Sequence, residues 1–282
     1  MNAIRIALIQ TTHDPAPGAM ATKYAALIAE AAATGAKLIV LPEFSLTAHP
    51  AAGAELVPEP VPGGEGCRVF AELGTSHGVF VVGSVYERGG VGFRKQRGAR
   101  FDTTVLFDPA GTFGGGCREQ HARDAGGDES RAGRGNSDYP LFALPDAVVA
   151  LPGGDDAYFP ELARIYGLKG AELLLFPSAV PAAMAGAWET MLRSHAVANG
   201  VFVAAANRAG AEGGSTWAGG SVIVAPDGEV LARGATEGDA VVSVELDPAR
   251  IVAAREAFPF LLRREPETYG VLMARLTLRE AA

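Results

Sequence analysis

The stretch that decides the fold is residues 147–179, AVVALPGGDDAYFPELARIYGLKGAELLLFPSA. Residues 147–151 are a short apolar run that predicts a β-strand, and a Pro-Gly-Gly turn ends it. Residues 159–168 predict a helix whose first turn contains a proline, where the missing N–H costs nothing. Residues 172–176 predict a second strand, which another proline ends. The order strand, turn, helix, strand is typical of an α/β protein.

The turn after the first of these strands is where a catalytic side chain is expected. A Gly-rich turn between a strand and a helix holds one residue on a sharp corner beside the helix N-terminus, and α/β enzymes often carry their nucleophile there. Here the corner is Gly153-Gly154, followed by Asp155 and Asp156. The corner therefore lacks a Ser, Cys or Thr side chain.

Composition bounds the class of protein. The chain has 282 residues, of which 48% are hydrophobic and 20% charged, enough to bury a large core. Its net charge of −8 argues against a nucleic-acid partner. No apolar window reaches about 18 residues, so no membrane span is expected. The N-terminus leads directly into a predicted strand without a signal peptide, and two cysteines make no disulfide framework, so we expect a cytoplasmic protein.

An internal repeat predicts the architecture. Residues 35–42, GAKLIVLP, match residues 170–177, GAELLLFP, and residues 78–81 match residues 200–203. A hairpin about a Pro-x-Gly turn follows in each half, whereas residues 89–100 and 118–138 are predicted to be loops. Two related halves of apolar strands with flanking helices predict a four-layer α-β-β-α sandwich.

Several motifs resemble those of the nitrilase superfamily of carbon–nitrogen hydrolases. Residues 154–161 fill the frame in which that family has Cys-Tyr-Asp-x-x-Phe-Pro-Glu, and the family's cysteine falls on Gly154. Further motifs match those of the family from the N-terminal half to the tail. They are Leu41-Pro42-Glu43, Gly170-Ala171-Glu172, Pro177-Ser178-Ala179, Ala198-Asn199-Gly200-Val201, Ala206-Asn207-Arg208, Gly219-Gly220-Ser221 and Arg263-Arg264 to Tyr269. The resemblance covers nearly the whole chain.

The resemblance implies the same sandwich fold, as one domain over residues 1–282 with residues 258–282 as a C-terminal tail. It implies a small-molecule amide, nitrile or amine as ligand, with no cofactor and no metal. It also implies a homodimer or a larger assembly, in which the tail often crosses to the partner.

The resemblance further implies positions for the catalytic groups. The family uses a Glu as general base, a Lys at the oxyanion and a Cys as nucleophile. These positions fall on Glu43, Glu119 and Gly154, so the nucleophile is absent and the charge at the lysine position is reversed. A second family glutamate falls on Glu129, in the long loop. Among the substrate-binding positions are Asp155, Asp156 and His121, and we interpret His121 as structural rather than catalytic.

Without a thiolate, the chain is not expected to run the family's thioester chemistry. Loss of the nucleophile alone cost about 10⁶ in turnover in another hydrolase. The first hypothesis is therefore a homologue that binds a small ligand or regulates through its oligomeric surface. The second is an amidase with a substituted apparatus, in which Glu43 is the base, Cys117 or an activated water is the nucleophile, and Lys95 or Arg94 assists the oxyanion. The third is a structural or regulatory subunit paired with an active relative.

The acidic residues themselves suggest one more property. If Glu43, Glu119 and one of Asp155 or Asp156 gather at one pocket, like charges lie close together with no lysine between them. Such a pocket must take up protons, bind a cation or bind an amine. The spacing of these residues does not match a compact calcium loop.

Overall fold

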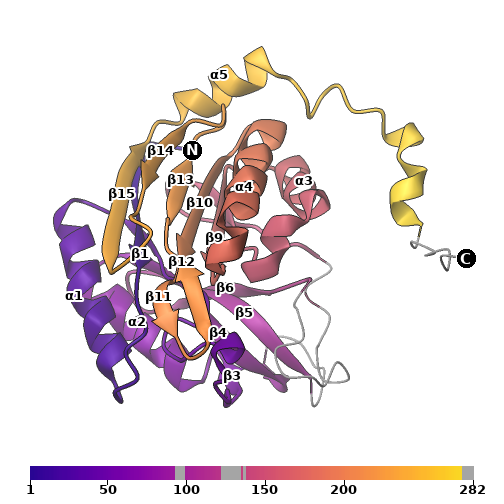
Figure 1. Ribbon diagram of the computed structural model, residues 1–282. Coiled ribbons are helices and arrows are strands. Elements are labelled where there is room, and N and C mark those ends of the chain that lie inside the picture. Colours follow the sequence, from indigo (N-terminus) through magenta and orange to yellow (C-terminus); the bar gives the residue numbers. More distant parts are fainter. Residues whose placement is uncertain (93–98, 122–134, 136–137, 275–282) are drawn as a thin grey trace, which may run out of the picture.

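The computed structural model describes residues 1–92, 99–121, 135 and 138–274, and shows two β-sheets packed face to face with helices outside (Figure 1). The first sheet has the strand order β15-β1-β2-β4-β5-β6, and β3 pairs with β4. Its strands are β1 (Ile4–Gln10), β2 (Leu38–Val40), β3 (Glu59–Val61), β4 (Phe80–Gly92), β5 (Arg100–Phe107), β6 (Phe113–Arg118) and β15 (Ala240–Leu246).

The second sheet has the strand order β14-β13-β10-β9-β8-β7. Its strands are β7 (Phe142–Ala143), β8 (Val148–Ala150), β9 (Leu173–Ser178), β10 (Phe202–Asn207), β13 (Val222–Val224) and β14 (Val230–Arg233). In the first sheet β1, β2 and β4 are parallel neighbours, and β5 and β6 follow as antiparallel strands. In the second sheet β8, β9 and β10 are parallel, and β13 and β14 follow antiparallel. The predicted relation between the two halves is therefore confirmed.

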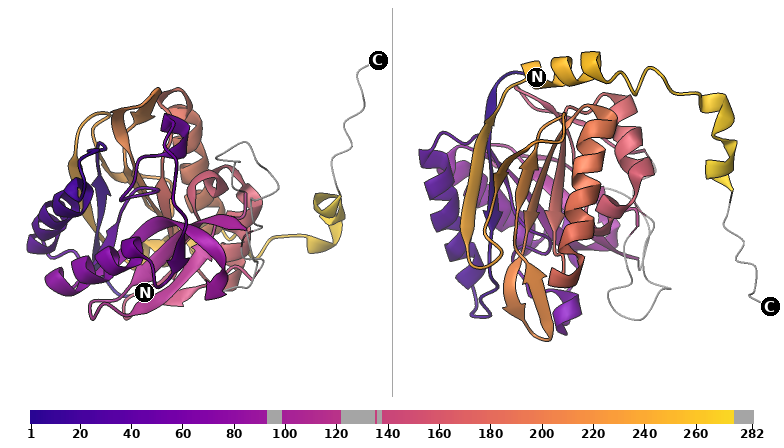
Figure 2. Two further views of the ribbon diagram at one scale, coloured as in Figure 1. Left: turned by 90° about the horizontal axis from the view of Figure 1, so that it is seen from below. Right: turned by 45° about the horizontal axis from the view of Figure 1, so that its top comes forward.

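Four helices complete the layers, two on the outer face of each sheet (Figures 1 and 2). The helices α1 (Ala19–Ala33) and α2 (Glu65–His77) pack on the first sheet through a cluster that includes Tyr24 and Phe70. The helices α3 (Pro160–Lys169) and α4 (Ala185–Asn199) pack on the second sheet through a cluster that includes Tyr166 and Trp188.

A third apolar cluster fills the space between the two sheets and includes Leu8, Leu175 and Phe202. Apolar side chains on both faces of each sheet explain why the strands read as continuous apolar runs rather than as alternating ones. The predicted four-layer α-β-β-α sandwich is confirmed.

Two details differ from the sequence-based expectation. The predicted loop 89–100 is wrong at both ends, because β4 continues to Gly92 and β5 begins at Arg100. The two strands pair as far as Arg88 and Arg100. Backbone pairing along the long hairpin overrides the low strand propensity of glycine and arginine there. The hairpin of β11 (Ala209–Glu212) and β12 (Ser215–Ala218) was missed, because its strands are short and contain glycine and alanine. Most of the predicted loop 118–138 lies outside the described residues.

The C-terminal part leaves the body of the molecule. After α5 (Ala249–Ala257) the chain runs outward and carries the short 3₁₀ helices η5 (Pro266–Thr268) and η6 (Gly270–Met273), as Figure 2 shows. Leu262 and Met273 on this segment are each 88% exposed. Within the part of the chain that the structure describes, no helix combines the length and apolar character that crossing a membrane requires.

Candidate functional site

The structure brings together three positions that the sequence predicted to share a site. Glu43 lies just beyond β2, Glu119 directly follows β6, and Gly154 begins the 3₁₀ turn η3 (Gly154–Tyr158) after β8. A Cβ atom added at Gly154 would lie 2.7 Å from Glu43 Oε2 and 3.0 Å from Glu119 Oε1. The carboxylates of Glu43 and Glu119 thus meet over the glycine, in the space that a side chain at position 154 would need. Their catalytic roles stay a prediction.

A tightly held turn aims Glu43 at this point. The Glu43 N–H donates to the Ser178 carbonyl (3.3 Å), and the Arg208 Nε donates to the Glu43 carbonyl (3.0 Å). Phe44 has φ +44°, a left-handed conformation that is rare for a non-glycine residue. The Phe44 N–H donates to Ser84 Oγ (3.1 Å), and Arg208 Nη2 donates to the Phe44 carbonyl (2.5 Å). These bonds keep the strained corner in place.

Burial and mutual repulsion change the charge of the acids. Burial, and then the charge of Asp155, raises the pKa of Glu43 to about 7. Burial, and then the charge of Asp102 and Glu43, raises the pKa of Glu119 well above its ordinary value. Burial, and then the charge of Glu43, raises the pKa of Asp102 likewise. We refer to Glu43, Asp102, Glu119 and Asp155 as the acid cluster, in which burial and the neighbouring acids favour the protonated forms of Glu43, Asp102 and Glu119.

The described basic groups near Glu43 and Glu119 do not neutralise these two acids. His49 Nε2 lies 3.3 Å from Glu43 Oε1, but burial, and then the charge of Arg208, lowers the pKa of His49 to about 4, so that its ring is uncharged at pH 7. The Arg208 guanidinium pairs with Glu212 at 2.7 Å and with backbone carbonyls. Among the described residues, no Lys or Arg forms an ion pair with Glu43 or Glu119. The described residues contain no group of three or more His, Cys, Asp or Glu side chains that could hold a metal ion.

The three predicted substrate-binding residues divide into two groups. The Asp155 N–H donates to Glu119 Oε1, and the charge of Asp155 raises the pKa of Glu43. Asp156 instead accepts hydrogen bonds from the His121 N–H (3.0 Å) and pairs with His121 Nδ1 (2.8 Å). The His121 ring stacks on Phe159 with 3.6 Å between ring centroids. These contacts favour a structural role for Asp156 and His121 and leave Asp155 at the acid cluster.

Other predicted positions lie elsewhere. Cys117 is buried in the cluster between the sheets, and its Sγ lies 3.2 Å from Tyr166 Oη, as expected for a core residue. Glu129, Lys95 and Arg94 lie outside the described residues.

Sequence reasoning missed His49 and Asp102. No local pattern marks His49, which lies six residues beyond Glu43. Asp102 carries a signal, because it directly precedes the predicted hairpin strand and, on an extended chain, shares a face with Thr104 and Leu106, two and four positions later. Leu106 belongs to the cluster between the sheets, so the same face points Asp102 inward.

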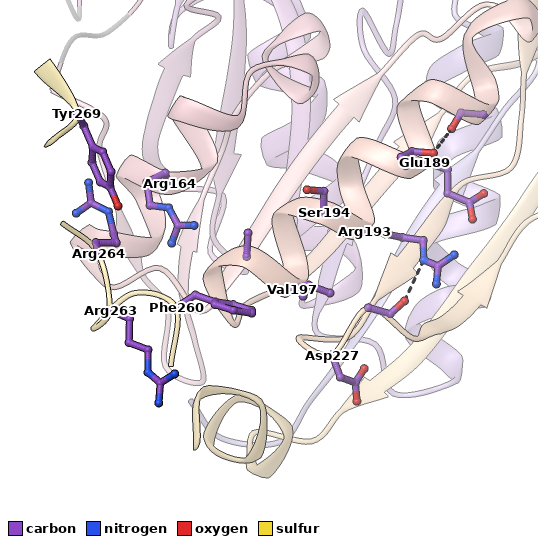
Figure 3. Close-up of a pocket in the computed structure, with 14 residues that line it drawn as sticks. Arg164, Glu189, Arg193, Ser194, Val197, Asp227, Phe260, Arg263, Arg264 and Tyr269 are labelled. Atoms are coloured by element: carbon purple, nitrogen blue, oxygen red, sulfur yellow. Dashed lines mark hydrogen bonds between the residues drawn. The ribbon is translucent and has the colours of Figure 1, made fainter. Parts of the chain in front are cut away.

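A second feature lies on the outer surface. A cavity of about 950 Å³ opens between α3, α4 and the C-terminal segment (Figure 3). Arg164 on α3, Arg193 on α4, and Arg263 and Arg264 on the C-terminal segment line it, and we refer to it as the arginine cavity. None of its lining residues belongs to the acid cluster.

Positive charge in the arginine cavity is incompletely compensated. Arg164 Nη1 is buried and has no hydrogen-bond partner among the described residues. Burial, and then the charge of Arg264, lowers the pKa of Arg164. The two acids that line the cavity are already paired with arginines outside its lining, Glu189 with Arg233 and Asp227 with Arg250. The molecule therefore gathers acidic side chains at one site and arginines at another.

Comparison with known proteins identifies the family. The sequence model of the family described as carbon-nitrogen hydrolase matches residues 5–256. Omega-amidase NIT2 of Homo sapiens is 31% identical over 97% of this chain and 99% of its own length. Omega-amidase NIT2 of Danio rerio is 30% identical over 96% of this chain and 98% of its own.

Solved structures agree with this result. The carbon–nitrogen hydrolase of Helicobacter pylori superimposes with a TM-score of 0.85 at 26% identity, over 97% of this chain and 99% of that one. A mutant of the amidase from Nesterenkonia sp. AN1, in complex with butyramide, gives a TM-score of 0.77 at 25% identity, over 94% of this chain and 95% of that one. The chain belongs to the carbon–nitrogen hydrolase family, in the nitrilase superfamily that its motifs resemble.

Proposed function

We propose that this carbon–nitrogen hydrolase homologue binds a small amide, nitrile or amine at the acid cluster and does not hydrolyse it through a thioester. The observation that carries the proposal is the glycine at position 154. A Cβ atom at position 154 would lie 2.7 Å from Glu43 Oε2 and 3.0 Å from Glu119 Oε1, but the glycine has no side chain there that could attack a carbonyl carbon. Covalent catalysis of this kind needs a nucleophilic atom at that point.

The protonation of Glu119 bears on what the site can bind. A charged Glu119 would repel a carbonyl oxygen. Burial raises the pKa of Glu119, so that the uncharged carboxyl can donate a hydrogen bond, while its Oε1 accepts the Asp155 N–H. A neutral Glu119 is compatible with an amide carbonyl even though it replaces a cation.

The relatives indicate which ligands to test. Two of them are omega-amidases, and one solved amidase holds butyramide. Butyramide and an omega-amide are therefore the first probes, followed by small nitriles, carbamoyl compounds and amines.

The test of the proposal is ammonia release from this panel. The parent protein is expected to release none, and the double variant Gly154→Cys, Glu119→Lys is expected to gain release. The space at position 154 is bounded by the ends of two flexible side chains, so the new cysteine needs Glu43 to move, and the same variant replaces Glu119. Calorimetric titration of the parent with butyramide is expected to show binding. Ammonia release by the parent that disappears in Glu43→Gln would overturn the proposal. The matched control is Glu245→Gln, which changes an exposed glutamate.

A second candidate function is an amidase that uses an activated water. Glu43 favours it, because a pKa of about 7 suits a general base at neutral pH. Cys117 is buried in the core between the sheets, which leaves water as the nucleophile for this candidate. The Glu43→Gln comparison above separates the two candidates.

The proposal extends to assembly. We propose one domain with residues 258–282 as a tail, a homodimer or larger assembly, and a cytoplasmic, ligand-binding or regulatory role. Exposed apolar residues on the outward C-terminal segment and the incompletely compensated arginine cavity support a surface that a second copy covers. Light scattering is expected to give a dimer or larger for the full chain and a smaller mass for a chain ending at Ala257. A full chain that is monomeric at micromolar concentration would contradict it.

A further inference from the structure

Asp102 is a buried acid with one unsatisfied oxygen. It lies on β5, is 7% exposed, and accepts a hydrogen bond from Ser84 Oγ at Oδ1 (2.6 Å). Its other oxygen, Oδ2, is buried and receives no hydrogen bond from the described residues. An ionised carboxylate with an unsatisfied buried oxygen is costly, so this oxygen needs a proton or a donor.

The group that faces Asp102 is the Glu43 carboxylate. After burial, the charge of Glu43 is the largest cause of the raised pKa of Asp102, and a side-chain hydrogen bond between the two carboxyl groups raises the pKa of Asp102 further and lowers that of Glu43. Two ionised carboxylates have only acceptor atoms, so a hydrogen bond between them forms only when one of them carries a proton.

We propose that Asp102 and Glu43 share one proton, and that Asp102 is the positioning residue that sets the protonation state of Glu43. The pair then offers a ligand one donor and one acceptor rather than two negative charges. This consequence for ligands rests on the proposed function, whereas the shared proton itself does not.

A short chain of hydrogen bonds holds the pair together. The Phe44 N–H donates to Ser84 Oγ (3.1 Å), and the Ser84 hydroxyl donates to Asp102 Oδ1 (2.6 Å). Phe44 is the residue after Glu43, so the strained corner and Asp102 are fixed to the same hydroxyl. The contact between the two carboxyl groups is therefore part of how β2, β4 and β5 meet.

The other charged groups around Glu43 leave the proton as the available compensation among the described residues. From the loop after β2, His49 is uncharged at pH 7. Beyond β8, Asp155 adds negative charge that raises the pKa of Glu43, and Glu119 beyond β6 is a further acid rather than a cation. After β10, Arg208 lowers the pKa of Glu43, but its hydrogen bonds go to Glu212 on β11 and to backbone carbonyls.

The experiment is a ¹³C NMR titration of side-chain carboxyl carbons between about pH 4 and 9 on the ligand-free protein. Glu43→Gln and Asp102→Asn assign the two signals. In the parent, both signals are expected to show the same two midpoints, because interacting sites titrate as a pair. Two independent single midpoints would overturn the proposal.

The variant Asp102→Asn sharpens the test. The Asn amide can donate to Glu43 but cannot ionise, so Glu43 is expected to titrate in one step, with a midpoint at least about one pH unit below the upper midpoint of the parent pair. An unchanged midpoint would overturn the proposal. Asp247→Asn is the matched control, because Asp247 is exposed and caps Ala249, a role that Asn also performs. Since no ligand is present, the result does not depend on whether the site binds or hydrolyses amides.

Discussion

The acid cluster and the arginine cavity are two concentrations of like charge that differ in how they can be relieved. In the acid cluster, buried carboxyl groups meet over Gly154 and hold protons. In the arginine cavity, Arg164 and Arg264 lie close enough for one to lower the pKa of the other. A carboxyl group can become neutral near pH 7, but a guanidinium stays charged in water at any physiological pH.

The two regions therefore depend on different solution conditions. The acid cluster can exist without a ligand by taking up protons, so its charge depends on pH. The arginine cavity keeps its charge, so it depends on solvent, salt and whatever anionic or neutral surface covers it. Burial of the acids and openness of the arginine cavity agree with this division.

The largest expected effect concerns Glu43. Its folded-state pKa of about 7 exceeds the ordinary 4.5, so the stability that its proton contributes is present below pH 4.5 and lost as pH rises to 7. At about 1.4 kcal/mol per pH unit, the loss approaches about 3 kcal/mol. The variant Glu43→Gln is therefore expected to gain up to about that much unfolding free energy relative to the parent between pH 4.5 and 7.5.

Urea unfolding of parent and variant across this range measures the difference. His49, with its pKa lowered to about 4, has the opposite pH dependence, and its contribution largely cancels when the two proteins are compared. If the difference in unfolding free energy between the two proteins does not change with pH, Glu43 is ionised over the whole range and the prediction is wrong.

The next effect concerns Glu119. At neutral pH an uncharged Glu119 has the same arrangement of donor and acceptor as a glutamine, and a Gln Oε1 keeps the bond from the Asp155 N–H. Glu119→Gln is therefore expected to change the unfolding free energy by less than about 1 kcal/mol at pH 6 and to stabilise the protein at pH 9. Destabilisation by more than about 2 kcal/mol at pH 6 would mean that a charged Glu119 is needed.

The smallest effect concerns the arginine cavity. Arg164→Gln removes one of two neighbouring cations and is expected to raise the unfolding free energy by less than about 1 kcal/mol at low salt, equally at pH 5 and pH 8. The gain is expected to shrink in 0.5 M NaCl because salt screens the repulsion. Arg68→Gln on α2, an exposed arginine, is the control. If the gain in unfolding free energy depends on pH, the arginine cavity responds to pH as the acid cluster does, and the prediction is wrong.

The sequence predicted much of the fold and part of the site. Apolar runs, prolines at strand ends and the repeated order of elements were enough for the sandwich, because these signals are local. Glu43 could be placed at the site because it follows a strand and a proline. The hairpin of β11 and β12 and the extension of β4 were missed, because pairing with a neighbouring strand stabilises residues of low strand propensity.

The two related halves and the absent side chain at position 154 can be read from the sequence alone, since a glycine has no side chain in any fold. The charge of the site instead depends on how the chain packs. Glu43, Asp102 and Glu119 come from separate strands, and their pKa values depend on burial and on one another. Those quantities exist only once the two sheets have packed and excluded water from the space between the carboxyl groups.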